Sequence, residues 1–172
     1  VSDLVLDLRY NGGGFLYIAS QVGYMIAGDA RTSGRTFERL QFNDKRVAET
    51  NDPNNNTPFF GTTSGFAGSG TTANTPLPQL NLSRVFVLAG PGTCSASESI
   101  VNALRGIDVQ VVLIGDTTCG KPYGFTAKDN CGISYFPIEF QGGNAKGFGD
   151  YGNGFAATCA VDDDFDHQLG DP

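Results

Sequence analysis

A strand–helix–strand pattern in the middle of the chain limits the folds that this protein can adopt. The segment Arg84–Ala89 is a short apolar run that ends at the turn Gly90-Pro91-Gly92, as a buried strand does. A helix-like segment at 97–104 follows, and a second apolar run lies at 109–114. Two strands that are joined through a helix usually pair in parallel. The pattern therefore predicts an α/β fold that contains a parallel sheet.

The segments before this pattern predict three further elements. Leu4–Leu8 predicts a mostly buried strand, and the apolar residues of Phe15–Ala27 recur at the spacing of a helix. Residues 35–43 alternate between apolar and polar side chains as a strand does, although Phe37 and Glu38 break the alternation. The order of these elements fits the same α/β fold.

Residues 44–79 differ from the segments on either side. They are rich in Asn, Thr, Gly and Pro and show no hydrophobic period. We interpret them as a long, partly flexible insertion, for which Phe59, Phe60 and Phe66 are candidate anchors. The part of the chain after Lys121 is predicted to be β-rich, because short apolar runs alternate there with glycine-rich turns. Its expected strands lie at 133–140 and 154–161.

Length and charge narrow the classes of function. The chain has 172 residues, so we expect one domain that spans 1–172. Its net charge of −7 repels phosphate backbones, which makes nucleic acid an unfavourable partner. The longest apolar run, Val85–Ala89, is far shorter than the ~18 residues that a membrane span requires. The chain begins without Met and almost directly with a strand, so we expect an excised part of a longer, exported protein.

Four cysteines are the candidates for disulfides or free thiols: Cys94, Cys119, Cys131 and Cys159. Zinc sites need closely spaced Cys or His ligands, whereas this chain has no Cys-x-x-Cys pair and one His. We therefore expect no metal site. Loops rich in Asn, Thr and Gly favour an exported protein, in which disulfides are stable.

Two strand-to-helix turns carry candidate chemistry. In the first, Asp7–Gly14, the glycines free backbone N–H groups at a helix start, which suits an oxyanion hole or a phosphate cradle. The alternative is an ordinary strand-to-helix turn that has no role in binding or catalysis. In the second, Gly92–Glu98, Ser95 takes the position of an exposed nucleophile at a helix start. The same Ser95-x-x-Glu98 spacing is also that of a helix capping box.

A third segment, Thr117–Gly124, supplies a lysine. Lys121 follows the apolar run 109–114 and is flanked by Gly, Pro and Tyr, although a solvated surface lysine is the simpler interpretation. The only histidine, His167, lies in an acidic tail and is interpreted as a surface residue. A nucleophilic Ser95 would thus need a base other than histidine, and lysine is the known variant.

Taken together, the three segments resemble the carboxyl-terminal processing peptidases, also called tail-specific proteases. That family has a D-L-R-x-N-x-G-G turn, then S-A-S-E, then T-x-G-K about 25 residues on. Here these motifs are Asp7-Leu8-Arg9-Tyr10-Asn11-Gly12-Gly13-Gly14, Ser95-Ala96-Ser97-Glu98 and Thr118-Cys119-Gly120-Lys121. The resemblance covers roughly Val1–Gly124.

The resemblance implies a serine endopeptidase that cleaves polypeptides near their C-termini through an acyl-enzyme. It makes Ser95 the nucleophile and Lys121 its general base. The oxyanion hole would be formed by the N–H of Ala96 and one from Gly13 or Gly14. No cofactor is implied.

The resemblance also implies supporting residues and a fold. Glu98 and Thr118 fall on positions that support the dyad, and the fold would be the β-β-α superhelix of Clp-type proteases and crotonases. The family often has Gln where this chain has Phe125, and a supporting Asp has no clean match near Asp108. The family's PDZ domain lies outside this sequence.

A dyad would bring Cys94 and Cys119 together, because each lies within two residues of a dyad member. We therefore expect a Cys94–Cys119 disulfide, which leaves Cys131–Cys159 as the second pair; a free Cys94 thiol is the alternative. Two rival functions remain at this point. One is a non-catalytic binding protein on the same fold, and the other is a crotonase-like acyl-CoA enzyme.

Overall fold

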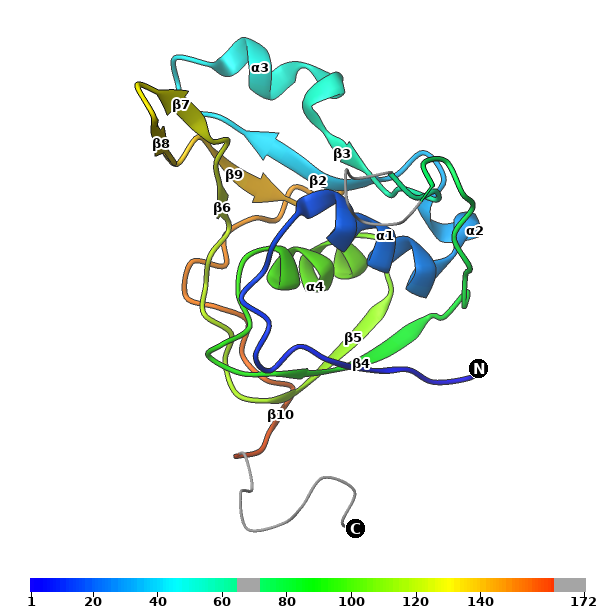
Figure 1. Cartoon of the computed structure of the whole chain (residues 1–172). Helices are drawn as coiled ribbons and strands as arrows, with labels where there is room; N and C mark the ends of the chain where they lie inside the picture. The colour runs from blue at the N-terminus through cyan, green and yellow to red at the C-terminus, as the bar shows by residue number, and fades with distance from the viewer. Residues whose placement is uncertain (65–71, 163–172) are drawn as a thin grey trace.

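A parallel sheet, a layer of helices and an antiparallel sheet are stacked in the computed structural model, which describes residues 1–64 and 72–162 (Figure 1). The parallel sheet has the order β1-β4-β5-β10. Its strands are β1 (Val5–Asp7), β4 (Arg84–Ala89), β5 (Gln110–Gly115) and β10 (Cys159–Ala160). All neighbouring pairs in it are parallel, which confirms the α/β prediction.

The helix α4 (Ala96–Gly106) forms the centre of the molecule. It packs against β5 of the parallel sheet and against the strand β2 (Thr36–Gln41) of the other sheet. Because both sides are covered, ten of its residues are buried, polar ones included. The residues of β4 and β5 that are directed to this side are also buried, as alternation along a strand requires.

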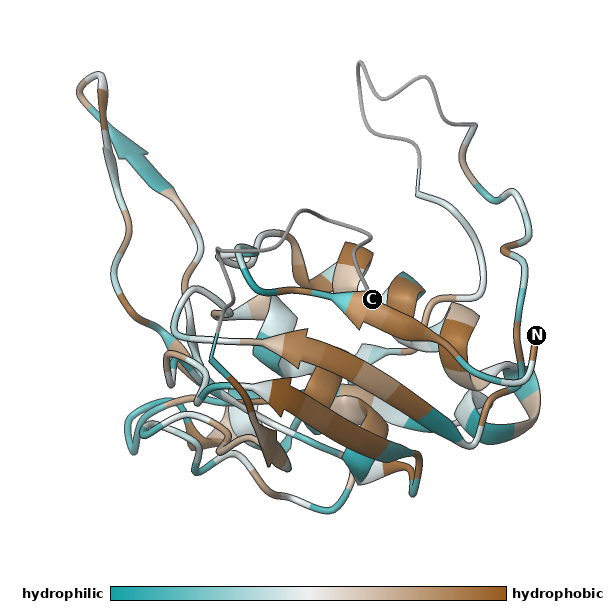
Figure 2. Ribbon diagram, turned by 90° about the horizontal axis from the view of Figure 1, so that it is seen from below, coloured by the Kyte–Doolittle hydropathy of each residue, from teal (hydrophilic) through white to brown (hydrophobic). Residues whose placement is uncertain are grey.

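The opposite face of the parallel sheet is largely apolar, and no helix of the described residues covers it (Figure 2). Figure 2 shows this sheet in front, with the helices behind it. On this face Val5 is 59% exposed, while Phe86 and Val112 are half-buried. The prediction of a mostly buried strand at Leu4–Leu8 is therefore wrong, because β1 lies at the edge of the sheet and packs through one face.

The antiparallel sheet has the order β3-β2-β9-β6 and closes the other side of the helix layer. Besides β2 it contains β3 (Thr57–Pro58), β9 (Phe140–Gly143) and β6 (Tyr123–Gly124). The helix α1 (Leu16–Ala27), which its sequence pattern predicted, packs beside α4, and the short α2 (Asp29–Thr32) follows it directly. A β-bulge interrupts β2 between Thr36 and Glu38.

The segment 44–79 has more secondary structure than its sequence predicted. It contains α3 (Val47–Asn51), the 3₁₀-helix η1 (Pro53–Asn55), β3 and a bridge between Thr62 and Pro76. Phe59 anchors it as expected, because its ring packs edge-on against that of Phe37 with centroids 5.3 Å apart. Phe66, the third candidate anchor, belongs to 65–71, which lie outside the described residues.

The C-terminal part contains only short strands. β7 (Lys128–Asn130) and β8 (Ile133–Tyr135) form a hairpin, and the long strands expected at 133–140 and 154–161 are reduced to β8, the start of β9, and β10. Gly132 and Gly142 flank the first of these runs and Gly154 begins the second, and such glycines allow turns to cut strands short.

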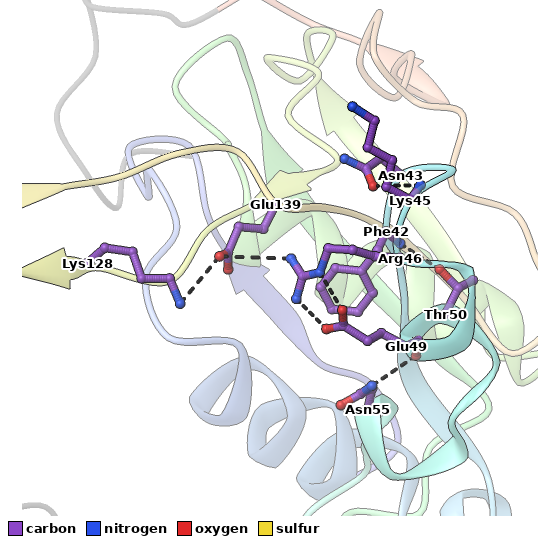
Figure 3. Close-up of polar contacts among 9 residues, drawn as sticks. All are labelled: Phe42, Asn43, Lys45, Arg46, Glu49, Thr50, Asn55, Lys128 and Glu139. Atoms are coloured by element: carbon purple, nitrogen blue, oxygen red, sulfur yellow. Dashed lines mark hydrogen bonds and ion pairs between the residues drawn. The ribbon is translucent and has the colours of Figure 1, made fainter.

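Ion pairs join the base of this hairpin to α3 (Figure 3). The Glu139 carboxylate lies 3.5 Å from the Lys128 amine and 4.0 Å from the Arg46 guanidinium, which also binds Glu49. The guanidinium stacks over the Phe42 ring, 4.1 Å from its centre. Exposed pairs of this kind contribute little stability each, but together they hold the chain that leads into β9.

Because α4 lies at the centre of the molecule, substitutions in its buried face should lower the stability of the protein. Leu104 is fully buried, whereas Leu80 is 37% exposed. We expect Leu104→Ala to lower the free energy of unfolding by about 2–5 kcal/mol, because it leaves a cavity between two layers. The matched change Leu80→Ala should cost less than about 1 kcal/mol. Urea denaturation of both variants measures the difference, and equal losses would contradict this assignment of the core.

Candidate active site

Ser95 occupies a strained turn at the start of α4. Its backbone has φ 55° and ψ −120°, a combination that residues with a side chain rarely adopt. The buried Thr93 holds this turn: its hydroxyl donates to the Leu8 carbonyl at 2.8 Å and accepts from the Gly90 N–H at 3.0 Å. The turn thus resembles a nucleophile elbow, in which a serine is held at a strand-to-helix junction.

The glycine turn after β1 lies directly against Ser95. A Cβ on Gly13 would stand 2.7 Å from the Ser95 Cβ, and Gly13 has φ +108°, so glycine is required there. The Asn11 carbonyl accepts from the Cys94 N–H at 3.1 Å and from the Ser97 hydroxyl at 3.1 Å. Two predicted segments, far apart in sequence, are therefore joined.

The two candidate oxyanion glycines have different surroundings. The Gly13 N–H donates to the Asn11 side-chain oxygen at 3.0 Å, so this donor is already engaged. Gly14 lines the same pocket as Ser95. Ala96, the third predicted donor, is the first residue of α4.

Glu98 joins the nucleophile turn to the lysine loop. Its side chain is fully buried, and its carboxylate accepts from the Ser95 N–H at 3.0 Å and from the Thr118 hydroxyl at 2.6 Å. It also accepts from the N–H groups of Gly120 and Lys121, both at 2.8 Å. Four donors offset the cost of burying this carboxylate.

Thr118 extends the connection to the C-terminal part of the chain. Besides donating to Glu98, its hydroxyl accepts from the Phe155 N–H at 2.7 Å, and its own N–H donates to the Phe155 carbonyl at 3.1 Å. Thr118 is only 4% exposed. Glu98 and Thr118, the two residues predicted to support the dyad, are therefore both buried and hydrogen-bonded to each other.

A disulfide adds a covalent link between the same two loops. Cys94 and Cys119 are bonded with Cα atoms 5.3 Å apart, which confirms the expected pair. The expected Cys131–Cys159 bond is wrong: both cysteines are free and exposed. Cys131 lies at the tip of the β7–β8 hairpin and Cys159 in β10, at opposite ends of the molecule (Figure 1).

Ser95 and Lys121 line one pocket of about 200 Å³. The rest of its wall is mainly apolar and comes from 14–16, β2, α4 and 122–140. It is formed by Gly14, Phe15, Leu16, Glu38, Ser99, Pro122, Tyr123, Gly124, Phe125 and Phe140. Lys121 is exposed, with its amine 5.3 Å from the centre of the Phe125 ring. The three predicted segments thus contribute to one concave site.

Glu38 is a residue of this pocket that the sequence did not identify. It is 4% exposed and, like Ser99 of α4, it lines the pocket. Burial raises the pKa of the Glu38 carboxyl to about 7. The break in alternation at Phe37 and Glu38 was the available signal, because the bulge there places both side chains inward.

No vacant metal site is present among residues 1–64 and 72–162. The one close group of metal-ligand side chains there is Cys94, Glu98 and Cys119. Both sulfur atoms belong to the disulfide, and the Glu98 oxygens accept four hydrogen bonds. His167, expected at the surface, lies outside the described residues.

The comparison with protein families decides the assignment of this chain. Residues 1–128 match the model of Peptidase family S41. The chain belongs to peptidase family S41. Members of family S41 are peptidases, so the pocket that contains Ser95 lies in a protease fold. No curated protein matches the sequence.

Solved structures support the same assignment. A protein from Bacteroides fragilis NCTC 9343 that is classed as an S41 protease is 28% identical, with a TM-score of 0.73 over 94% of this S41 chain and 38% of its own. The photosystem II D1 C-terminal processing protease is 21% identical, with a TM-score of 0.60 over 94% of this chain and 35% of its own. A lipoprotein from Streptococcus agalactiae is 12% identical, with a TM-score of 0.57 over 93% and 50%.

The S41 chain thus spans between about a third and half of these structures' lengths. The last two share the fold alone with it, since their identities are low. Within the described residues, no helix has the length and apolar character that a membrane crossing requires.

The disulfide beside the site should stabilise the protein measurably. It closes a loop between residues 25 positions apart, and such a loop corresponds to about 3 kcal/mol. We expect the double change of Cys94 and Cys119 to Ala to lower the free energy of unfolding by about that amount. Changing Cys131 and Cys159 to Ser is the matched control and should have little effect. Equal losses, measured by guanidinium denaturation, would show that the Cys94–Cys119 link does not constrain the chain.

Glu38 should make stability depend on pH. Its carboxyl has a pKa of about 7 in the folded protein and about 4.5 ordinarily, so the folded state holds a proton that the unfolded chain has lost. The free energy of unfolding should therefore fall as pH rises from about 4.5 to about 7, by on the order of 3 kcal/mol. Glu38→Gln should remove this slope. Parallel pH curves of the two proteins would refute the assignment.

Proposed function

We propose that this S41 chain is the catalytic part of a serine peptidase in which Ser95 is the nucleophile and Lys121 the general base. The observation that carries the proposal is that both side chains line one pocket, with Ser95 held in a strained turn at the start of α4. A serine in this position needs a partner that accepts its proton, and the described part of the pocket offers the Lys121 amine.

The proposed reaction begins when the Lys121 amine accepts the proton of the Ser95 hydroxyl. The serine oxygen attacks the peptide carbonyl, and the N–H groups of Ala96 and Gly14 stabilise the oxyanion. Lys121 then gives the proton to the leaving amine, and water hydrolyses the acyl-enzyme. A peptide that lies in the pocket would also exclude water from the exposed amine and from the serine oxygen.

Glu98 acts in this proposal as a positioning residue. It accepts the backbone N–H groups of both Ser95 and Lys121, at 3.0 Å and 2.8 Å. The distance between the two proposed dyad members is thus set by one carboxylate and by the neighbouring disulfide. This arrangement orders the groups before substrate binds, which is a known source of catalytic rate.

The finer features of the proposal concern substrate, fold and location. We propose an endopeptidase that cleaves near protein C-termini, on the β-β-α superhelix of Clp-type proteases and crotonases, in one domain that spans 1–172. We also propose export, because the Cys94–Cys119 disulfide is stable in oxidising compartments. Mass spectrometry of the products of an unstructured polypeptide would locate the cleaved bonds.

The dyad can be tested by single substitutions. We expect Ser95→Ala and Lys121→Ala each to lower kcat/KM on an unstructured polypeptide by at least about 10³-fold, because each removes a group that acts only as part of the pair. Ser134→Ala and Lys45→Ala are matched controls on the surface and should keep activity. Circular dichroism should show the same fold for all four variants.

A second measurement distinguishes the enzyme from a binding protein on the same fold. A serine-reactive fluorophosphonate should label the wild-type protein at Ser95 and leave Ser95→Ala unlabelled. Peptidase activity that survives in purified Ser95→Ala would contradict the proposal. A wild-type protein that binds peptides without turnover and without labelling would favour the non-catalytic alternative.

A further inference from the structure

We propose that the pocket beside Ser95 receives the side chain that precedes the cleaved bond, and that Glu38 selects a cationic residue there, Lys or Arg. The inference rests on the proposed peptidase function and adds to it the class of side chain that the site accepts. Its basis is the contrast between the two buried carboxylates of the site, one saturated with donors and one not.

Glu38 is directed into the pocket by the local geometry of β2. The bulge between Thr36 and Glu38 buries two successive side chains, so Phe37 enters the core and Glu38 enters the pocket. On the far side β9 offers Gly142, where any Cβ would collide with the Glu38 carboxylate. A bulge and a glycine therefore create the room that this acid occupies.

The hydrogen-bond partners of the two carboxylates differ. Glu98 accepts four donors from the loops around it. For Glu38 the neighbouring polar side chain is Ser99 of α4, and no Lys or Arg of residues 1–64 and 72–162 forms an ion pair with it. A buried carboxylate gains most from an opposite charge, so this one has a vacant place for a cation.

The walls of the pocket suit a long side chain with a cationic end. Phe15, Phe125 and Phe140 line it, and its volume of about 200 Å³ is enough for one extended side chain. Aromatic faces attract cations, and the apolar stem of Lys or Arg can pack along them. The Lys121 nitrogen lies 5.3 Å from the centre of the Phe125 ring, so this ring face is within reach of a nitrogen in the pocket.

The groups that face Glu38 determine the expected pH dependence. α4 brings the Ser99 hydroxyl, and the chain after β9 brings Tyr151, whose pKa is raised by burial and by the charge of Glu38. Lys121 lies on the pocket wall, whereas β3 and β9 contribute no titratable side chain. Burial raises the pKa of Glu38 to about 7, so the carboxylate charge and the preference for a cation should grow as pH rises through 7.

The test compares peptides that differ only in the residue before the cleaved bond. Lysine is paired with norleucine, which has a similar length without the charge. For the wild-type protein at pH 8 we expect kcat/KM to be at least about 10-fold higher for lysine, and this ratio should fall towards 1 below pH 6. In Glu38→Gln the ratio should be near 1 at every pH. Glu139→Gln is the matched control outside the pocket and should keep the wild-type ratio.

Binding to Ser95→Ala separates this inference from the proposed function. If no peptide is cleaved and no probe labels Ser95, the peptidase proposal fails. Fluorescence anisotropy with the same two peptides still measures the preference for lysine. Tighter binding of the lysine peptide that is lost in Ser95→Ala/Glu38→Gln would support the selectivity of Glu38. A wild-type protein that prefers norleucine, or a lysine preference that survives Glu38→Gln, would overturn it.

Discussion

The Glu98 carboxylate is the interaction on which the arrangement of the site depends. It lies fully buried one turn into α4, where an unpartnered charge would be too costly to keep. Its four donors come from the turn of Ser95 and from the loop 118–121, two segments that no strand pairing joins. The Cys94–Cys119 disulfide spans the same gap covalently. The Glu98 oxygens receive all four hydrogen bonds only when both loops lie against them, so this carboxylate fixes the position of one loop relative to the other.

Other buried polar side chains of α4 position neighbouring loops in the same way, through hydrogen bonds. The helix is enclosed by two sheets, so its polar side chains are buried and each must find a partner. Ser97 donates to Asn11, which fixes the glycine turn. Asn102 donates to the Phe148 carbonyl at 2.9 Å and thereby orders the chain after β9. One helix therefore positions loops from both halves of the protein.

The two buried glutamates of the site illustrate different uses of the same side chain. Glu98 accepts four hydrogen bonds and serves structure, whereas Glu38 forms no ion pair with the described residues and faces the pocket. Desolvation without a counter-charge keeps the proton on Glu38 to about pH 7, within the range in which proteins work. A group of this kind responds to the charge of whatever enters the pocket, because the ligand supplies what the protein lacks.

The sequence by itself determined the local elements and the chemistry of the three turns. Apolar runs and glycine punctuation placed β4, β5, α1 and α4 to within two residues, because these patterns reflect interactions between near neighbours. The small residues around Gly13 and the Ser95-x-x-Glu98 spacing marked a site for the same reason.

Only the tertiary structure decided which residues meet. The exposure of Val5 depends on β1 being an edge strand, and the burial of Glu38 depends on a bulge and on Gly142 across the sheet. Cys131 and Cys159 stay apart because a hairpin and a sheet edge separate them, which no count of cysteines reveals. Each of these outcomes depends on contacts between distant segments, and such contacts exist only once the layers have packed.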